Sequence, residues 1–199
     1  MLDALRQYLS RYVAFTNEEF APLAQVLEVR SFDKHYQLVK AGDSDIYINF
    51  VIKGLARKYF YRGKDEVITQ IAIENDFITS SVSFLSGKPS AYYVETIEAC
   101  TFLSLSRCHM DRLYWENPRF ERLGRMMITH FFLQQELWDL DYIRFGTRER
   151  FIQFVQNNPD LLQRVPQKYL ASYLNMKPET FSRFKHLLTK SGPAEPEIR

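Results

Sequence analysis

The sequence contains few residues of the kinds that build disulfide frameworks or metal centres. Its 199 residues include two cysteines, Cys100 and Cys108, and four histidines that are dispersed and form no ligand motif. Two cysteines suggest neither a zinc site nor a disulfide scaffold, and a reducing cytosol is the simplest compartment for them. We therefore expect no metal and no cofactor.

Long hydrophobic runs are also absent. No window approaches the roughly 18 apolar residues of a membrane span, and the N-terminal segment carries Asp3 early, without the apolar core of a signal peptide. These absences predict a cytoplasmic protein with no membrane partner. The hydrophobic share of 46% and the charged share of 25% are typical of soluble globular proteins, and the length suits one large domain or two small ones.

The net charge of +2 hides an uneven distribution. Residues 164–190 hold six lysines or arginines and a single acidic residue, Glu179, which gives this stretch a charge of +5. Residues 1–163 carry about −2. A basic surface confined to the C-terminal part of a chain indicates nucleic acid as the partner.

The first half of the sequence is typical of short helices followed by strands. Residues 1–27 show two helical pieces, and Thr16 with Glu19 forms the capping box that begins the second piece. From Glu28 to Ser106, short β-branched and aromatic runs alternate with turn signals, which predicts a sandwich or a small barrel. Residues 46–53 alternate between an apolar set that includes Phe50 and a mixed set, so we expect a half-buried strand here.

A long helix is predicted next. After a short helix at residues 108–116, Pro118 restarts the chain, and residues 119–145 contain no proline and one interior glycine. Apolar side chains lie on two faces of this helix, one for the β domain and one for the same helix of a second subunit. Burial of the whole helix within a monomer is the alternative. The residues predicted for the dimer face are Leu123, Met127, Phe131 and Trp138.

The C-terminal third carries the most informative pattern. A helix at residues 148–157 precedes two further helices, the first from Gln167 to Leu174 and the second starting at Pro178. Asn175 tolerates the left-handed conformation in which the chain leaves a helix, and Ala171 is small where the two helices would cross. Two helices joined by a turn of three or four residues are the signature of a helix-turn-helix.

The second helix of this motif would present its polar side to DNA. Arg183 can donate two hydrogen bonds to a guanine, and Glu179, one turn earlier, can accept one from a cytosine in the major groove. The alternative is a surface ion pair between these two residues. The side chains predicted to contact phosphates are Gln167, Lys168, Lys177, Thr180, Ser182 and His186.

The order of these parts, together with Glu179-Thr180-Phe181-Ser182-Arg183, resembles the Crp/Fnr family of bacterial transcription regulators. The resemblance covers nearly the whole chain. It implies an α+β fold: a cupin-like antiparallel β-roll of the cyclic-nucleotide-binding type at 1–117, a dimerisation helix at 118–145 and a helix-turn-helix domain at 146–190. It also implies a homodimer that binds double-stranded DNA, has RNA polymerase as a candidate partner and is not an enzyme.

The resemblance is weaker where cyclic-AMP-binding members hold their ligand. Those members use a Glu for the ribose and an Arg for the phosphate, and here Ser80 and Pro89 stand at those places. A phosphate without its bidentate cation loses its strongest bonds, so we expect no response to cyclic AMP. The hydroxyl groups of this region either hold another effector, which the sequence does not name, or line a vestigial site. The residues of this candidate pocket are Thr79, Ser80, Ser81, Ser90 and Ala91.

Two further departures concern the ends of the chain. No cysteine cluster stands near the N-terminus, so the iron–sulfur sensing mode of the family is not implied. We expect the hairpin wing that often follows the recognition helix to be reduced or absent, and residues 191–199 to form a disordered tail. The prediction is a sequence-specific transcriptional regulator. A ligand-binding cupin-like protein and a constitutive protein-interaction module with a basic C-terminus are the alternatives.

Overall fold

The computed structural model describes the backbone of residues 1–190 and the side chains of residues 1–187. The chain divides into two compact units, one of residues 1–134 and one that begins at Gln135. The division falls inside the long helix rather than at either of its ends. The predicted tail at 191–199 lies outside the described residues.

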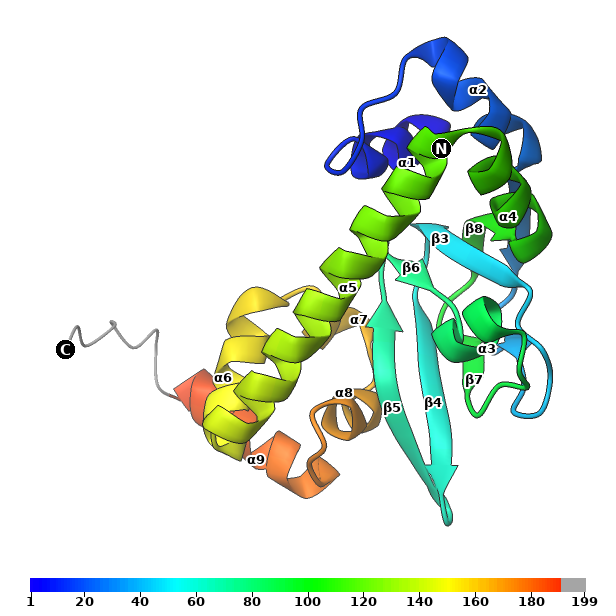
Figure 1. Cartoon of the computed structure of the whole chain (residues 1–199). Helices are drawn as coiled ribbons and strands as arrows, with labels where there is room; N and C mark the ends of the chain where they lie inside the picture. The colour runs from blue at the N-terminus through cyan, green and yellow to red at the C-terminus, as the bar shows by residue number, and fades with distance from the viewer. Residues whose placement is uncertain (191–199) are drawn as a thin grey trace. The chain divides into compact units, whose positions relative to one another are not determined.

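The N-terminal helices of the first unit are α1 (Leu2–Leu9) and α2 (Asn17–Val26). The predicted capping box is confirmed: Thr16 Oγ1 accepts from the Glu19 backbone N–H at 3.2 Å, and Glu19 Oε2 accepts from the Thr16 N–H at 2.9 Å. The short helices α3 (Ser81–Ser86) and α4 (Arg107–Glu116) follow later in the chain. In Figure 1, α1, α2 and α4 lie together at one end of the β-strands.

The strands form two antiparallel four-stranded sheets, which together make the predicted β-roll. One sheet has the order β1-β8-β3-β6 and the other β2-β7-β4-β5. The first sheet consists of β1 (Glu28–Phe32), β3 (Tyr47–Lys53), β6 (Phe77–Ile78) and β8 (Cys100–Ser106). The second consists of β2 (Gln37–Val39), β4 (Ala56–Arg62), β5 (Asp65–Ala72) and β7 (Tyr93–Thr96).

Strand β3 differs from the half-buried strand that its sequence predicted. Phe50 is buried on one face, where its ring meets the Tyr8 ring of α1 at 5.6 Å between centroids. Val51 is buried on the other face, in the apolar core of the roll with Phe102. Ile46, expected inside, is exposed. Both faces are covered because the N-terminal helices pack on the outside of the roll, which the alternation of residues within one strand does not reveal.

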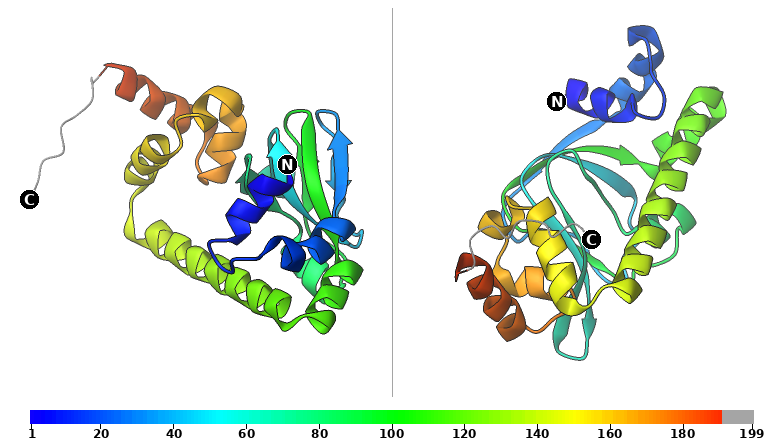
Figure 2. Two further views of the ribbon diagram at one scale, coloured as in Figure 1. Left: turned by 90° about the horizontal axis from the view of Figure 1, so that it is seen from above. Right: turned by 90° about the vertical axis from the view of Figure 1, so that its left-hand side faces the viewer.

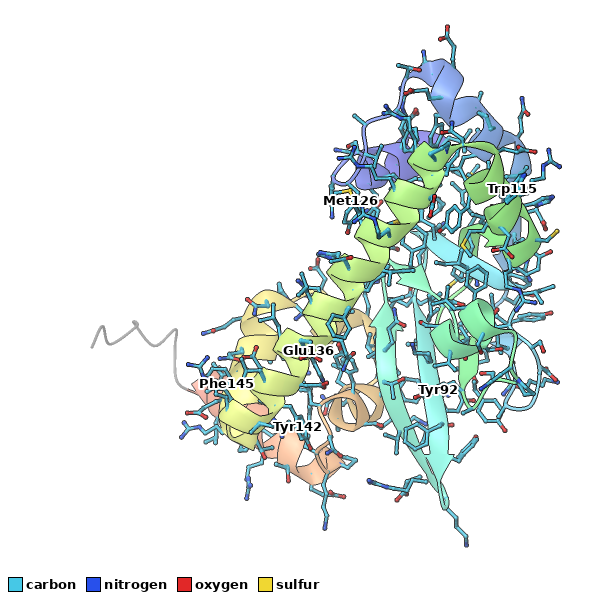
Figure 3. The ribbon with its side chains drawn as sticks, in the orientation of Figure 1. Tyr92, Trp115, Met126, Glu136, Tyr142 and Phe145 are labelled. Carbon is cyan, nitrogen blue, oxygen red and sulfur yellow. The ribbon has the colours of Figure 1, made fainter. Side chains whose placement is uncertain are left out.

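The long helix α5 (Pro118–Arg144) begins in the core of the first unit. A Cβ atom on Gly124 would collide with the Tyr114 hydroxyl, so the interior glycine lets α5 approach α4 closely. Figure 3 labels Met126, Glu136, Tyr142 and Phe145 along the helix and just after it. Met126 packs on the core of the first unit, whereas Glu136 and Tyr142 belong to the second unit.

The second unit is helical throughout its described part, and it contains no strand up to residue 190. Phe151, Leu170 and Phe181 form the centre of its core, and each is at most 1% exposed. Helix α7 is a single turn that the sequence did not signal. Figure 2 shows these helices from two further sides. After α5 they are α6 (Thr147–Asn157), α7 (Leu161–Arg164), α8 (Gln167–Tyr173) and α9 (Pro178–Lys190).

Candidate DNA-binding surface and effector region

The turn between α8 and α9 has the geometry of a specific helix ending. Asn175 adopts a left-handed conformation with φ of 51°, as its sequence position predicted. The Asn175 N–H donates to Ser172 O and the Met176 N–H donates to Ala171 O, both at 2.9 Å. These two bonds are those of a Schellman motif, which satisfies the last carbonyls of α8 and turns the chain sharply. Helix α9 then begins at Pro178.

Packing between α8, α9 and α6 fixes the angle of this turn. Ala171 and Leu170 are fully buried, and the rings of Phe151 on α6 and Phe181 on α9 meet edge to face at 5.1 Å. The small side chain of Ala171 is buried on the helix that packs against α9, as expected at a close crossing. Helix α9 is therefore held on its apolar side, and its other side carries exposed residues.

The exposed side of α9 presents both residues predicted to read bases. Glu179 and Arg183 are exposed, one turn apart on the same helix. Within the described residues they form no ion pair with each other, so the predicted alternative of a surface pair is not realised. Arg183 lies with its guanidinium 5.5 Å from the centroid of the Phe184 ring. Both charged groups can therefore reach a ligand without first breaking a contact with each other.

The residues predicted to contact phosphates surround this pair. Gln167 and Lys168 are exposed at the N-terminus of α8, and Lys177 is exposed just before α9. Thr180 and Ser182 are half-buried on α9, and His186 is exposed on its next turn. Lys168 lies 4.9 Å from the centroid of the Tyr169 ring, which leaves its ammonium at the surface.

Most of the hydroxyl groups predicted for an effector pocket form hydrogen bonds with other groups of the protein. Thr79 Oγ1 donates to Asp45 Oδ2 at 2.8 Å, and the Ser80 N–H donates to the same oxygen at 2.7 Å. Ser90 Oγ lies 2.7 Å from Ser80 Oγ and 2.8 Å from Tyr92 O. Thr79, Ser80, Ser90 and Asp45 are all buried, whereas Ser81 and Ala91 are exposed and take no part in these contacts.

Two charged residues that the sequence did not single out lie in this region. Burial raises the pKa of Asp45, although its bonds from Ser80, Thr79 and Tyr47 oppose that effect. Burial lowers the pKa of Lys58, and the Asp45 charge opposes it. Lys58 Nζ donates to Thr79 O at 3.5 Å and lies 5.6 Å from the centroid of the Tyr92 ring. No local pattern marks Asp45, because its hydrogen bonds come from Thr79 and Ser80, 34 and 35 residues later in the chain.

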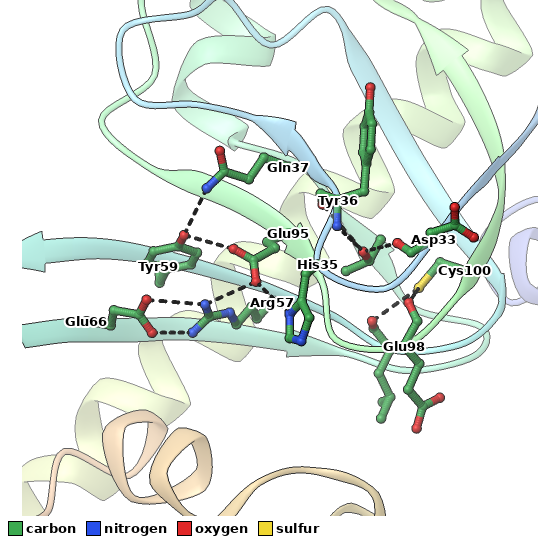
Figure 4. A network of polar contacts seen from close by, with 12 residues as sticks. Asp33, His35, Tyr36, Gln37, Arg57, Tyr59, Glu66, Glu95, Glu98 and Cys100 are labelled. Atoms are coloured by element: carbon green, nitrogen blue, oxygen red, sulfur yellow. Dashed lines mark hydrogen bonds and ion pairs between the residues drawn. The ribbon is translucent and has the colours of Figure 1, made fainter.

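The opposite face of the second sheet carries a separate polar network (Figure 4). Arg57 Nη1 donates to Glu66 Oε2 at 2.6 Å, and Arg57 Nη2 donates to Glu95 Oε1 at 3.2 Å. Tyr59 Oη donates to Glu95 Oε2 at 3.0 Å, and His35 Nδ1 lies 3.4 Å from Glu95 Oε1. These contacts join β4, β5, β7 and the turn before β2, so the network ties the sheet together.

The comparisons with known proteins concern the fold. No protein-family model and no curated protein matches the sequence. Among solved structures, FixK2 from Bradyrhizobium japonicum is 18% identical, with a TM-score of 0.70 over 83% of this chain and 85% of that one. The c-di-GMP responsive global regulator CLP from Xanthomonas campestris is 13% identical, with a TM-score of 0.67 over 86% and 90%. The chain has the Crp/Fnr fold.

A third structure of this fold matches over a larger share of the chain. The catabolite activator protein of Thermus thermophilus is 17% identical, with a TM-score of 0.57 over 94% of this chain and 91% of that one. The predicted α+β architecture, with a β-roll, a long helix and C-terminal helices, is thereby confirmed. Within residues 1–190, no helix is long and apolar enough to cross a bilayer. No cluster of three or more His, Cys, Asp or Glu in those residues is placed to hold a metal ion.

The four residues of α5 that were predicted for a dimer face differ in their exposure. Leu123 is 6% exposed and packs in the core of its own unit, and Met127 is partly buried there, so the prediction of a dimer contact at Leu123 is corrected. Trp138 is exposed in part, and its ring lies 5.2 Å from the ring of Tyr173 on α8. Phe131 remains 40% exposed. Other large apolar side chains exposed on α5 are Ile128, Phe132, Leu133, Leu137, Leu140, Tyr142 and Ile143.

Proposed function

We propose that the chain is a sequence-specific DNA-binding transcriptional regulator of the Crp/Fnr type. The observation that carries this proposal is the α8–α9 unit, in which the Schellman turn at Asn175 and the buried Phe181 hold α9 with Glu179 and Arg183 exposed and unpaired with each other. A recognition helix of this kind places its N-terminal residues at base edges in the major groove. The net charge of +5 over residues 164–190 supports binding to phosphates.

The proposed regulator acts as a homodimer through α5. Exposed apolar side chains gather on the helix beyond Met127, as expected of a surface that a second copy covers. Two recognition helices related by a two-fold axis would read half-sites one DNA turn apart. A signal in the β-roll would act by changing how the two α5 helices pack. RNA polymerase is a candidate partner, the cytoplasm is the proposed location, and the role is binding rather than catalysis.

The proposed regulator does not respond to cyclic AMP. Ser80, which stands where cyclic-AMP-binding members place a Glu, is buried, and its hydroxyl already contacts Ser90. Pro89 offers no cation to a phosphate. Lys58 contacts this region by donating to Thr79 O, and a lysine lacks the bidentate geometry that an arginine supplies.

Selection of bound sequences from random duplex DNA, with and without cyclic AMP, tests the proposal directly. The expected result is one palindromic motif that is recovered equally under both conditions. Recovery only with the nucleotide would overturn the assignment of the hydroxyl region. Salt-dependent binding with no motif would favour the interaction module with a basic C-terminus, and no binding to DNA would favour a ligand-binding cupin-like protein.

The Arg183→Ala variant distinguishes hydrogen bonding to bases from a general attraction of positive charge to DNA. The variant should lose about 1–3 kcal/mol of binding free energy on the selected motif and tolerate more bases at one position of each half-site. Lys168→Ala, which removes a predicted phosphate contact, should weaken binding to all sequences and lower the slope of affinity against salt. Binding free energies come from fluorescence anisotropy at several salt concentrations. An equal loss on every sequence for Arg183→Ala would contradict its role in reading bases.

A further inference from the structure

A cavity of about 210 Å³ is lined only by residues of the second unit. Its walls come from the C-terminal part of α5, from α6 and from the residues that end α6 and α8. Its volume lies below the range typical of drug-sized ligands, so its occupant would be a small molecule. The lining residues are Trp138, Asp141, Tyr142, Arg150, Gln153, Phe154, Asn157, Asn158 and Leu174.

Arg150 brings an uncompensated positive charge to this cavity. Its Nε and Nη1 atoms are buried and have no hydrogen-bond partner among the described residues. The guanidinium lies 4.0 Å from the centroid of the Tyr142 ring, and the Tyr142 hydroxyl accepts a hydrogen bond from Asn175 Nδ2, so the ring that supports Arg150 is itself fixed. Buried guanidinium donors without an acceptor are costly, and a carboxylate would satisfy them.

Asp141 brings a negative charge to the same cavity. Its carboxylate makes no hydrogen bond or ion pair within the part of the chain that the structure describes, Arg150 included. Asp141 is exposed and Arg150 is half-buried, so a ligand that carries both charges can pair with each of them without displacing a protein partner. The side-chain amides of Gln153, Asn157 and Asn158 add donors and acceptors around them.

The rest of the wall is apolar. Trp138, Phe154 and Leu174 line the cavity, and the Trp138 and Phe154 rings both lie within 6 Å of the Tyr173 ring, at 5.2 and 5.9 Å between centroids. Leu174 and Phe154 are buried. An apolar wall beside two separated charges matches a molecule with an apolar group next to a zwitterionic head.

We propose that this cavity binds a free α-amino acid with an apolar side chain. The carboxylate of the ligand pairs with Arg150, its ammonium pairs with Asp141, and its side chain contacts Trp138, Phe154 and Leu174. The ligand would join α5 to α6 and α8 and so restrain the helix-turn-helix against the long helix. The effect on DNA binding rests on the proposed function, whereas binding of the amino acid does not.

Calorimetry on the full chain tests the proposal without DNA. L-Valine, L-leucine, L-methionine and L-phenylalanine are titrated separately, and saturable one-to-one binding of at least one of them is expected. For leucine, the matched probes are 4-methylpentanoate, which lacks the ammonium, and isoamylamine, which lacks the carboxylate. Each should bind at least ten-fold more weakly. Binding of none of the four amino acids, or equal binding of a one-charge analogue, would overturn the proposal.

Variants of the two charged residues link the binding to this cavity. Arg150→Gln and Asp141→Asn should each lower the affinity at least ten-fold. The controls are Arg148→Gln on α6 and Glu136→Gln on α5, which remove exposed charges that do not line the cavity and should leave the affinity unchanged. Circular dichroism confirms that each variant is folded. Unchanged affinity in folded Arg150→Gln would overturn the assignment. Anisotropy with the selected DNA, with and without ligand, separately measures regulation.

Discussion

Lys58 shows how a single residue inside the β-roll can work against stability. Lys58 is half-buried, and the hydrogen bond that its Nζ donates to Thr79 O is long at 3.5 Å. Burial lowers the pKa of Lys58, since a charged amine loses hydration inside the protein, and the negative charge of Asp45 recovers part of that loss. A buried charge with few partners is often less stable than an apolar group of similar volume.

Lys58→Met should therefore raise the free energy of unfolding by about 1 kcal/mol at neutral pH. Because the native pKa lies below the unfolded value of 10.5, the unfolded chain holds more protons between these two values. The stability of the wild type relative to the variant should rise with pH across that window. Urea denaturation at several pH values measures both effects, with Lys64→Met in the exposed β4–β5 turn as the control. A destabilised Lys58→Met variant would show that the Thr79 and Asp45 contacts outweigh the burial of the charge.

The two cysteines should differ in reactivity. Cys100 is 2% exposed, its Sγ donates to Leu55 O at 3.1 Å, and burial raises the pKa of its thiol to about 11. Cys108 is exposed on α4. Because the thiolate is the reactive form, native protein at pH 8 should show one reactive thiol by a chromogenic disulfide assay, and two after denaturation. Cys108→Ser should show none while native. A second fast thiol in the native wild type would contradict the burial of Cys100.

At the scale of elements, the α8–α9 turn depends on a residue that accepts a positive φ. Asn175→Ala places alanine at a φ of 51°, where its Cβ is strained and its side chain can form no hydrogen bond to relieve the strain. The variant also loses the hydrogen bond to the Tyr142 hydroxyl. We therefore expect the free energy of unfolding to fall by about 1–2 kcal/mol. Asn175→Gly removes the same bond without the backbone penalty and should lose less. Thermal and urea denaturation compare the pair. Equal losses in the two variants would show that the hydrogen bond alone matters.

Local signals made the ends of elements predictable from the sequence. Thr16 and Glu19 cap α2 through bonds three residues apart, and Asn175 and Pro178 mark the end of α8 and the start of α9 within four residues. Such signals act between neighbours in the chain, so no tertiary information is needed to interpret them. Helix α9 and its exposed Glu179 and Arg183 were predictable for the same reason.

Features that depend on distant segments were not predictable in this way. Phe50 and Val51 are both buried because α1 covers one face of β3 and the opposite sheet covers the other. The Thr79 hydroxyl was predicted for a pocket, but its hydrogen bond to Asp45, 34 residues earlier in the chain, depends on tertiary structure. Asp141 and Arg150, which do not pair with each other, lie on two different helices that line one cavity.

At the scale of the whole molecule, α5 has apolar side chains that the rest of the chain leaves exposed. Its N-terminal part ends in a buried position at Leu123, and from Ile128 onward large apolar side chains are exposed in succession. Several large apolar side chains exposed along one helix mark an interaction site. The proposed occupant is α5 of a second copy, since a homodimer of parallel helices would pair like with like along the same side chains.

Phe131→Asp should convert the proposed dimer into a monomer. Phe131 is 40% exposed, so the substitution does not place a charge in the core of the single chain, whereas in a dimer it would bury two carboxylates beside the partner's apolar side chains. Sedimentation velocity should show the loss of the dimer, and affinity for the selected palindrome should fall at least 100-fold because each half-site would be bound alone. Trp115→Asp is the control, since Trp115 is 91% exposed on α4 and lies outside α5. If Phe131→Asp stays dimeric with its circular dichroism unchanged, the dimer forms through another surface, and the exposed apolar side chains of α5 must then be assigned to a different partner.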